Sequence, residues 1–150
     1  MITVVQRVSE ADVKINGNIS GKIGKGLLVL AGFEDADTDD DIQWMSGKII
    51  HLRIFPDENE VMNKSILDCD GQMLVISQFT LHASTKKGNR PSYMKAAKPE
   101  VAIPLYNSFI EKLRNDLGKN VESGEFGADM KVHLVNDGPV TIIIDSKHKK

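Results

Sequence analysis

Cysteine and long apolar runs are both scarce in this sequence. Cys69 is the one cysteine in 150 residues, so no internal disulfide can form, and a lone cysteine of this kind is typical of a packing residue in a reducing compartment. The longest apolar run covers residues 27–31, far short of the ~20 residues that a membrane-spanning helix needs. The N-terminus lacks the basic-then-apolar order of a signal peptide. We therefore expect a cytoplasmic protein with no membrane partner.

Common catalytic and metal-binding motifs are also missing. The sequence has no Walker loop and no Gly-x-Ser-x-Gly elbow. Its histidines are scattered, without the spacing of metal ligands, at His51, His82, His133 and His148. The sequence therefore predicts neither a metal nor a cofactor, and it gives no support for a standard catalytic triad.

Charge is nearly balanced overall, at a net −2, but unevenly distributed. An acidic block comprises Glu34, Asp35, Asp37, Asp39, Asp40 and Asp41. We expect a solvated surface there, at a position where carboxylates stabilise the start of a helix. A basic stretch comprises Lys86, Lys87, Arg90, Lys95 and Lys98. Phosphate contacts and a plain solvated loop are both compatible with it. The closing residues 146–150 are expected to form a frayed basic tail.

Hydrophobic periodicity predicts one α+β domain over residues 1–150, with two main helices and a curled or barrel-like, mostly antiparallel sheet. Strands are expected at 2–8, 13–15, 19–23, 27–31, 53–55, 72–77, 131–136 and 139–145. The first helix should begin after Thr38 as N-cap, and the second near Pro99. Pro104 lies inside the second helical pattern and should kink that helix or delay its start.

The first candidate site segment is Ser77-Gln78-Phe79-Thr80-Leu81, where a buried strand emerges. If the strand continues, Gln78, Thr80 and His82 share one face. Thr80 would then be a nucleophile or a positioning hydroxyl, with His82 as a possible base. Spacing alone favours a simpler alternative, an edge strand whose hydroxyls cap backbone groups.

The second candidate segment is Asn136-Asp137-Gly138-Pro139-Val140-Thr141. In isolation this pattern indicates a plain turn between two strands. Only about 5–6% of X–Pro bonds in folded proteins are cis, so the segment alone gives no basis for a cis bond at Gly138-Pro139.

These segments and several others, in this order and spacing, resemble the D-aminoacyl-tRNA deacylases of the bacterial and eukaryotic type. The resemblance covers almost the whole chain. It rests on Gln6-Arg7-Val8, residues 21–30, Arg53-Ile54-Phe55, Met62-Asn63, residues 77–81, Lys87-Gly88-Asn89-Arg90-Pro91, residues 124–130 and residues 136–141. The departures are Asp12, where the family usually has a small residue, Pro104 within a normally uninterrupted helix, and the extension 146–150.

The resemblance implies an enzyme that hydrolyses the ester of D-aminoacyl-tRNA while rejecting the L form. If the L form is rejected by steric exclusion, glycine offers no clash, and we predict activity on glycyl-tRNA too. The resemblance also implies a homodimer with active sites at the interface and tRNA as partner, without DNA. By resemblance, the pocket floor comprises Ser77, Gln78, Phe79 and Thr80, and a cis Gly138-Pro139 from the other subunit forms a chirality gate oriented by Arg7. An adenosine pocket would comprise Phe126, Gly127, Ala128 and Met130, and phosphate contacts would come from Lys86, Lys87, Arg90 and Lys95.

Three other interpretations compete with this one. A non-catalytic RNA-binding module would keep the basic stretch, but it has no need of Thr80 or of Gly138-Pro139, and both are present. A generic esterase would use Thr80 and His82 on small esters without chiral preference. A structural dimerisation domain would leave residues 77–80 unexplained.

Overall fold

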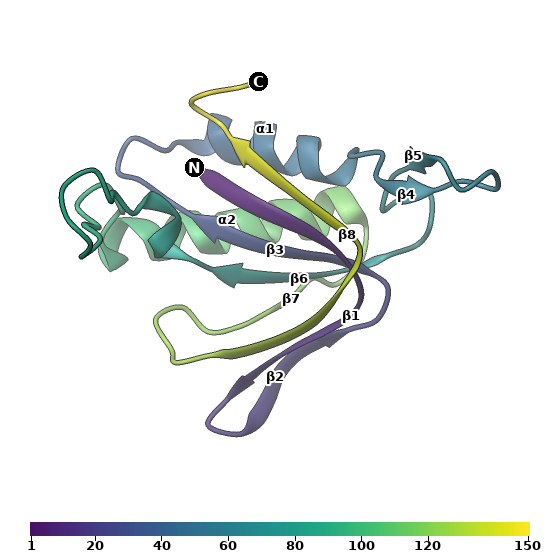
Figure 1. Cartoon of the computed structure of the whole chain (residues 1–150), viewed down its shortest axis with the longest axis horizontal. Helices are drawn as coiled ribbons and strands as arrows, with labels where there is room; N and C mark the ends of the chain where they lie inside the picture. The colour runs from purple at the N-terminus through teal and green to yellow at the C-terminus, as the bar shows by residue number, and fades with distance from the viewer.

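The computed structural model describes all 150 residues and confirms the α+β class (Figure 1). Its main sheet has six strands in the order β2-β1-β3-β6-β7, with β8 paired to β1, and β4 and β5 form a separate pair. The elements are β1 (Ile2–Ile15), β2 (Asn18–Ile23), β3 (Gly26–Gly32), α1 (Asp39–Ile50), β4 (Phe55–Pro56), β5 (Met62–Lys64), β6 (Gln72–Ser77), the 3-10 helix η1 (Phe79–His82), α2 (Pro99–Leu117), β7 (Glu122–Ser123) and β8 (Lys131–Asp145).

The main sheet curls because β1 is long and pairs with three other strands. The first half of β1 lies between β3 and β8, and its second half lies between β2 and β8. This arrangement brings β2 round towards β6 and β7. Ser20 Oγ donates a hydrogen bond of 3.2 Å to the carbonyl of Ser123, and a Cβ on Gly21 would lie 3.1 Å from that same oxygen. The expected curled sheet is confirmed.

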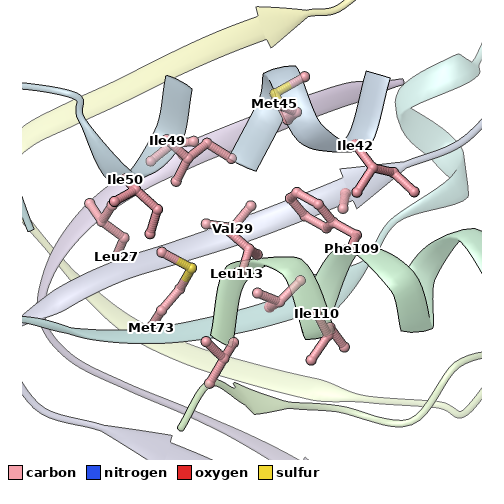
Figure 2. Packing of buried hydrophobic residues seen from close by; sticks show 14 of the residues in the cluster. Leu27, Val29, Ile42, Met45, Ile49, Ile50, Met73, Phe109, Ile110 and Leu113 are labelled. Carbon is pink, nitrogen blue, oxygen red and sulfur yellow. The ribbon is translucent and has the colours of Figure 1, made fainter. Parts of the chain in front are cut away.

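Two hydrophobic clusters lie on the two sides of this sheet. Helices α1 and α2 cover one face (Figure 1), and Figure 2 shows Met45 and Ile49 of α1 and Phe109 of α2 gathered around Val29 of β3. The smaller cluster fills the inside of the curl and consists of Val8, Ala11, Val13, Ile23, Leu28, Leu74 and Ile76. Since β3 and β6 contribute to both clusters, their central residues are buried on both faces, as a near-continuous apolar run predicts.

Helix α1 starts after Thr38 as predicted, and the Thr38 backbone N–H donates to Asp41 Oδ2 over 2.9 Å. The expectation of a solvated acidic block is wrong for two of its members. Asp37 and Asp41 are buried, because Asp37 accepts a hydrogen bond from the Met1 ammonium group and Asp41 one from Lys147 Nζ over 2.8 Å. Burial alone would raise the pKa of Asp41, but hydrogen bonds from Lys147 and from the Thr38 N–H lower it well below the ordinary value.

Helix α2 begins at Pro99 as predicted, and Pro104 lies inside it without delaying its start. Proline at this point removes one backbone hydrogen bond, to the carbonyl of residue 100. Glu100 is exposed, so water can hydrate the freed carbonyl. Neither helix combines the length and the apolarity that a membrane crossing requires.

The expectation of two closing strands, at 131–136 and 139–145, separated by a turn is wrong, because both belong to β8. It is one strand of 15 residues that pairs antiparallel with β1 over its length. The register shifts between Gln6 and Val8 and between Val8 and Glu10, which accommodates Asp137-Gly138-Pro139 as a local bulge. After β8, the stretch expected to fray contacts the domain: the Ser146 N–H donates to the Met1 carbonyl over 3.0 Å, and Lys147 binds Asp41.

Candidate active site

The segment after β6 turns instead of continuing as a strand. The Gln78 N–H donates to the Ala31 carbonyl over 2.7 Å, and the chain then forms η1 from Phe79 to His82. Gly32 makes the turn possible, because a Cβ at that position would lie 2.8 Å from the Gln78 carbonyl oxygen. The expected shared strand face for Gln78, Thr80 and His82 is therefore wrong.

Gln78, which directly precedes η1, interacts with Thr80 of η1. Gln78 Nε2 donates to Thr80 Oγ1 over 2.5 Å, and both side chains are half-buried. Since the Thr80 oxygen accepts this bond, its own proton remains available to a third group. The backbone N–H groups of Phe79 and Thr80 are the first two of η1, and the first N–H groups of a helix have no partner within that helix. The segment thus presents one hydroxyl and two N–H donors together.

His82 does not join this hydroxyl. Its side chain is buried, no hydrogen bond connects it to Thr80, and its Nε2 has no partner. The Thr80–His82 pair that a generic esterase would use is therefore not assembled.

A cavity of about 260 Å³ lies beside the hydroxyl segment. The structure brings together here two groups that the sequence places about fifty residues apart. The cavity is lined by Ser77, Gln78 and Phe79 and, from the chain before β8, by Phe126, Gly127, Ala128 and Met130, with Ile76 and Val132 behind them. A larger groove beside Trp44 and the end of β8 contains none of these residues.

Tyr106 of α2 supports one wall of the cavity, a role that the sequence did not indicate. Its ring packs against Phe126 with centroids 5.9 Å apart. Its hydroxyl donates to the Val75 carbonyl of β6 over 3.0 Å. Burial raises the pKa of Tyr106 to about 12, so the hydroxyl stays protonated at neutral pH. A tyrosine on the apolar face of a helix gives no sign of this task, because apolar periodicity alone accounts for it.

The second candidate segment forms an exposed corner (residues 137–139) with a cis bond between Gly138 and Pro139. Gly138 has φ +139°, and a Cβ there would lie 2.7 Å from Val140 Cγ2 and 3.0 Å from Arg7 Nη2. Arg7 of β1 anchors the corner. Its Nε donates to the Asp137 carbonyl over 2.8 Å, and its Nη1 donates to the Ile54 carbonyl over 2.6 Å. Only glycine fits at position 138 without displacing these neighbours.

Asn136 also anchors the corner, through hydrogen bonds to the two residues that follow the corner. Its Oδ1 accepts the Val140 N–H over 2.8 Å, and its Nδ2 donates to Thr141 Oγ1 over 3.0 Å. The side chain therefore spans the corner and ties its two ends together. The sequence places Asn136 and Thr141 in the same motif as the Gly-Pro pair, and that proximity was the one available signal for this role.

In one chain, the corner and the hydroxyl segment lie at opposite ends of β6. Arg7 of β1 pairs with Leu27 of β3, which pairs with Met73 near the start of β6, whereas Ser77 ends that strand. Four residues of strand span ~13 Å. Figure 1 shows the bend of β8 and the carboxyl end of β6 at different ends of the sheet. Neither Gly138 nor Pro139 lines the cavity of the same chain.

The predicted phosphate-contacting residues lie in the exposed stretch between η1 and α2. Backbone bonds in both directions between Ser84 and Ser92, of 2.8 and 2.9 Å, close a loop that carries Lys86, Lys87 and Arg90, and Lys95 follows this loop. Lys86, Lys87, Arg90 and Lys95 are exposed. None of the salt bridges in the chain involves any of the four.

Comparison with known proteins gives one consistent family. The model of the D-Tyr-tRNA(Tyr) deacylase family matches residues 4–145. A D-aminoacyl-tRNA deacylase of Flavobacterium psychrophilum is 64% identical over 150 residues, covering 100% of both chains. One of Parabacteroides distasonis is 62% identical with the same coverage. The chain belongs to the D-Tyr-tRNA(Tyr) deacylase family, which confirms the resemblance.

Solved structures agree on the fold. One titled c-Myc DNA Unwinding Element Binding Protein superposes with a TM-score of 0.89 at 42% identity, over 97% of this chain and 98% of that one. A second, described as a probable eukaryotic D-amino acid tRNA deacylase, gives a TM-score of 0.82 at 20% identity over 95% and 97% of the two chains. At that lower identity the likeness concerns the fold alone.

Proposed function

We propose that this protein hydrolyses the ester bond of D-aminoacyl-tRNA, releasing free tRNA and a D-amino acid, as a chirality check in translation. The observation that carries this proposal is the exposed Gly138-Pro139 corner, held by Arg7 and Asn136. A backbone corner tied down on both sides suits the reading of the configuration at one carbon atom. The activity named for the full-length relatives is the same. Because charged tRNA is its substrate, we place the protein in the cytoplasm.

The reaction needs mainly positioning and charge stabilisation, because an aminoacyl ester is already activated. Water adds to the carbonyl carbon, the bond to the ribose oxygen breaks, and that oxygen leaves with a proton. The N–H groups of Phe79 and Thr80, at the start of η1, are suited to stabilise the negative charge that develops on the carbonyl oxygen. The Thr80 hydroxyl, positioned by Gln78, orients water or the neighbouring ribose 2′-OH. We assign Thr80 this positioning role and not that of the nucleophile.

Selectivity would come from steric exclusion at the α-carbon. In this proposal, carbonyl groups of the corner hold the substrate amino group and leave no space where an L side chain would project. Such a mechanism rejects one configuration without recognising any particular side chain. It therefore suits a substrate class that includes many D-amino acids.

The corner would act on the active site of a second copy of the chain. Within one chain it lies at the wrong end of β6 to reach the Phe79 cavity. Strand β8, which carries the corner, pairs only with β1 and leaves its other edge free, and its Val135 and Ile143 are 48% and 72% exposed. An open strand edge with apolar side chains is a common association surface. We propose a homodimer in which each corner completes the partner's pocket.

Subunit complementation tests this arrangement. Gly138→Ala alters the corner and Gly32→Ala alters the hydroxyl segment, so each variant alone should have low activity. If the corner acts in trans, a mixed dimer contains one intact site. Random reassembly of the two variants should then restore about a quarter of wild-type activity. No recovery after verified subunit exchange would contradict action in trans.

Parallel deacylation of D-tyrosyl-tRNA and L-tyrosyl-tRNA tests the function itself. The wild-type protein should hydrolyse the D ester and leave the L ester intact. Gly138→Ala should lower kcat/KM for the D ester about a hundredfold, because small displacements of positioning groups have effects of this size. Gly17→Ala is the matched control, since Gly17 also has positive φ (+79°) but nothing within 4 Å. Hydrolysis of both esters at similar rates would contradict a chirality check.

Basic residues would hold the tRNA through its phosphates without reading bases. Replacing Lys87 and Arg90 together by glutamate should weaken tRNA binding and flatten its dependence on salt, by about one slope unit for each lost contact. Lys14→Glu is a control cation on β1, outside the loop. An unchanged salt slope would remove these contacts from the proposal. We expect a DNA duplex of equal length to bind more weakly than tRNA in the same assay.

A further inference from the structure

Large apolar side chains remain exposed just outside the mouth of the cavity. Phe79, which lines the cavity, is 53% exposed, Tyr93 is 40% exposed and Met94 is 94% exposed. The Phe79 and Tyr93 rings pack edge to face, with centroids 5.2 Å apart and an interplanar angle of 72°. We call Phe79, Tyr93 and the adjoining Met94 the platform; it begins at Phe79 in the cavity lining and continues through the packed ring of Tyr93.

Unpaired cations lie on both sides of Tyr93 and Met94 in the chain. Lys86, Lys87, Arg90, Lys95 and Lys98 are all exposed, and none forms a salt bridge, whereas Lys112 and Lys119 elsewhere each bind an aspartate. No acidic residue occurs anywhere from residue 77 to residue 98. The loop that carries Lys86, Lys87 and Arg90 is closed by Ser84 and Ser92, directly before Tyr93. The positive charge is therefore held beside the platform.

We propose that Tyr93 and Met94 form a stacking subsite for the unpaired nucleotides that precede the aminoacylated adenosine at the 3′ end of tRNA. This inference rests on the proposed function and extends it from the reacting nucleotide to its neighbours. Aromatic side chains among free cations suit single-stranded nucleic acid, because bases stack on the former and phosphates approach the latter. Stacking accepts any base, as an enzyme that acts on many tRNAs requires.

Charge complementarity favours RNA over a second copy of the chain on this surface. Two copies meeting through their platforms would bring two sets of five unpaired cations together, with no carboxylate from residues 77–98 to offset them. A polyanion such as RNA is attracted to these cations instead, and each phosphate contact that it makes releases bound counterions. The platform also begins at Phe79, where the reacting nucleotide would lie, so the preceding nucleotides are the part of the substrate nearest to it.

Two substrates separate this subsite from the reaction centre. D-tyrosyl-tRNA contains the preceding nucleotides, and the D-tyrosyl ester of adenosine lacks them. The informative quantity is the ratio of kcat/KM for the tRNA ester to that for the adenosine ester. Tyr93→Ala should lower this ratio about tenfold and Met94→Ala about threefold, mainly through KM for tRNA. Tyr93→Phe should preserve the ratio, because its ring still stacks. Met62→Ala is the matched control, an exposed methionine (55%) on the separate hairpin.

Binding of a labelled, unpaired RNA tetranucleotide provides a second measurement that needs no turnover. Tyr93→Ala should weaken it about tenfold, while Met62→Ala should leave it unchanged. Equal losses on both esters would overturn the subsite and make Tyr93 a support of Phe79. An unchanged ratio with a changed sedimentation coefficient would overturn it in favour of contact between copies. If the wild-type protein hydrolysed neither ester, the proposed function would fail, and RNA binding would still decide whether the subsite exists.

Discussion

The two halves of the candidate site are built in different ways. The corner is held by side chains: Arg7 bonds the Asp137 carbonyl, and Asn136 spans from Val140 to Thr141. The hydroxyl segment is held by backbone, through the Gln78–Ala31 bond and the close approach of Gly32. Because different groups hold the two halves in place, different kinds of substitution should disrupt each of them. Apart from substitution of Gly138 itself, removing a supporting side chain should damage the corner, whereas adding one at Gly32 should damage the hydroxyl segment.

Arg7→Ala should damage the corner half as strongly as Gly138→Ala does. In this variant, the carbonyl groups of Asp137 and Ile54 lose their hydrogen-bond donor. The corner therefore loses its side-chain anchor to β1. We expect kcat/KM for D-tyrosyl-tRNA to fall about a hundredfold. Arg7→Lys should recover little, because an ammonium group lacks the planar fork that reaches two acceptors. Wild-type kinetics in Arg7→Ala would show that the corner keeps its position without side-chain support.

Gly32→Ala should damage the hydroxyl half by adding only a methyl group. The new Cβ would lie 2.8 Å from the Gln78 carbonyl oxygen, so η1 must shift. Overpacking of this kind costs about 2 kcal/mol, which corresponds to about a thirtyfold loss in kcat/KM if it falls on the transition state. Gly47→Ala, where nothing lies within 4 Å of the new Cβ, should match wild type. Equal activity of the two variants would show that η1 tolerates displacement.

Thr80→Val tests whether the hydroxyl half depends on a side chain after all. If Thr80 only positions water or the 2′-OH, kcat should fall about tenfold. Loss of a nucleophile would instead cost on the order of 10⁴-fold or more. Single-turnover deacylation of D-tyrosyl-tRNA distinguishes these results. A loss of the larger size would contradict the positioning role and make this half rely on a side chain as strongly as the corner does.

Glycyl-tRNA should show the smallest difference from the D substrate. The corner is proposed to exclude an L side chain, and glycine presents only hydrogen at that place. We expect hydrolysis within about tenfold of the rate for D-tyrosyl-tRNA, since a small apolar difference discriminates by about that much. The measurement compares both substrates at equal enzyme concentration. Untouched glycyl-tRNA, at enzyme levels that clear the D ester, would require the corner to recognise a D side chain.

Local patterns predicted the parts of the fold that depend on local physics. The N-cap Thr38, the strand β6 from Gln72 to Ser77 and the start of α2 at Pro99 all follow from capping and periodicity. The turn into η1 does not, because it depends on Gly32, a residue from another strand. The burial of Asp37 likewise depends on the Met1 ammonium group, which comes from the far end of the sheet's first strand.

The same distinction between local patterns and contacts formed only on folding applies to the candidate site. The resemblance to a family supplied Ser77, Gln78 and Phe79 together with Phe126, Gly127, Ala128 and Met130, which line one cavity. It also supplied Thr80, which does not line that cavity itself but hydrogen-bonds to Gln78, which does. It gave no role to Asn136 or Tyr106, whose partners are seen only once the chain is folded. Nor could spacing predict that β8 is continuous, because an Asp-Gly-Pro sequence indicates a turn unless a neighbouring strand accommodates it as a bulge.

The register irregularities between β1 and β8 have a consequence for folding fidelity. A slip of one residue between two strands exchanges their inner and outer faces. In β8 it would turn the half-buried Ile142 outward and the exposed Ile143 inward over a strand of 15 residues. The bulges at Gln6–Val8 and Val8–Glu10 fit only one alignment. The same irregularity that makes room for the corner thus also fixes which neighbour every residue of the last strand meets.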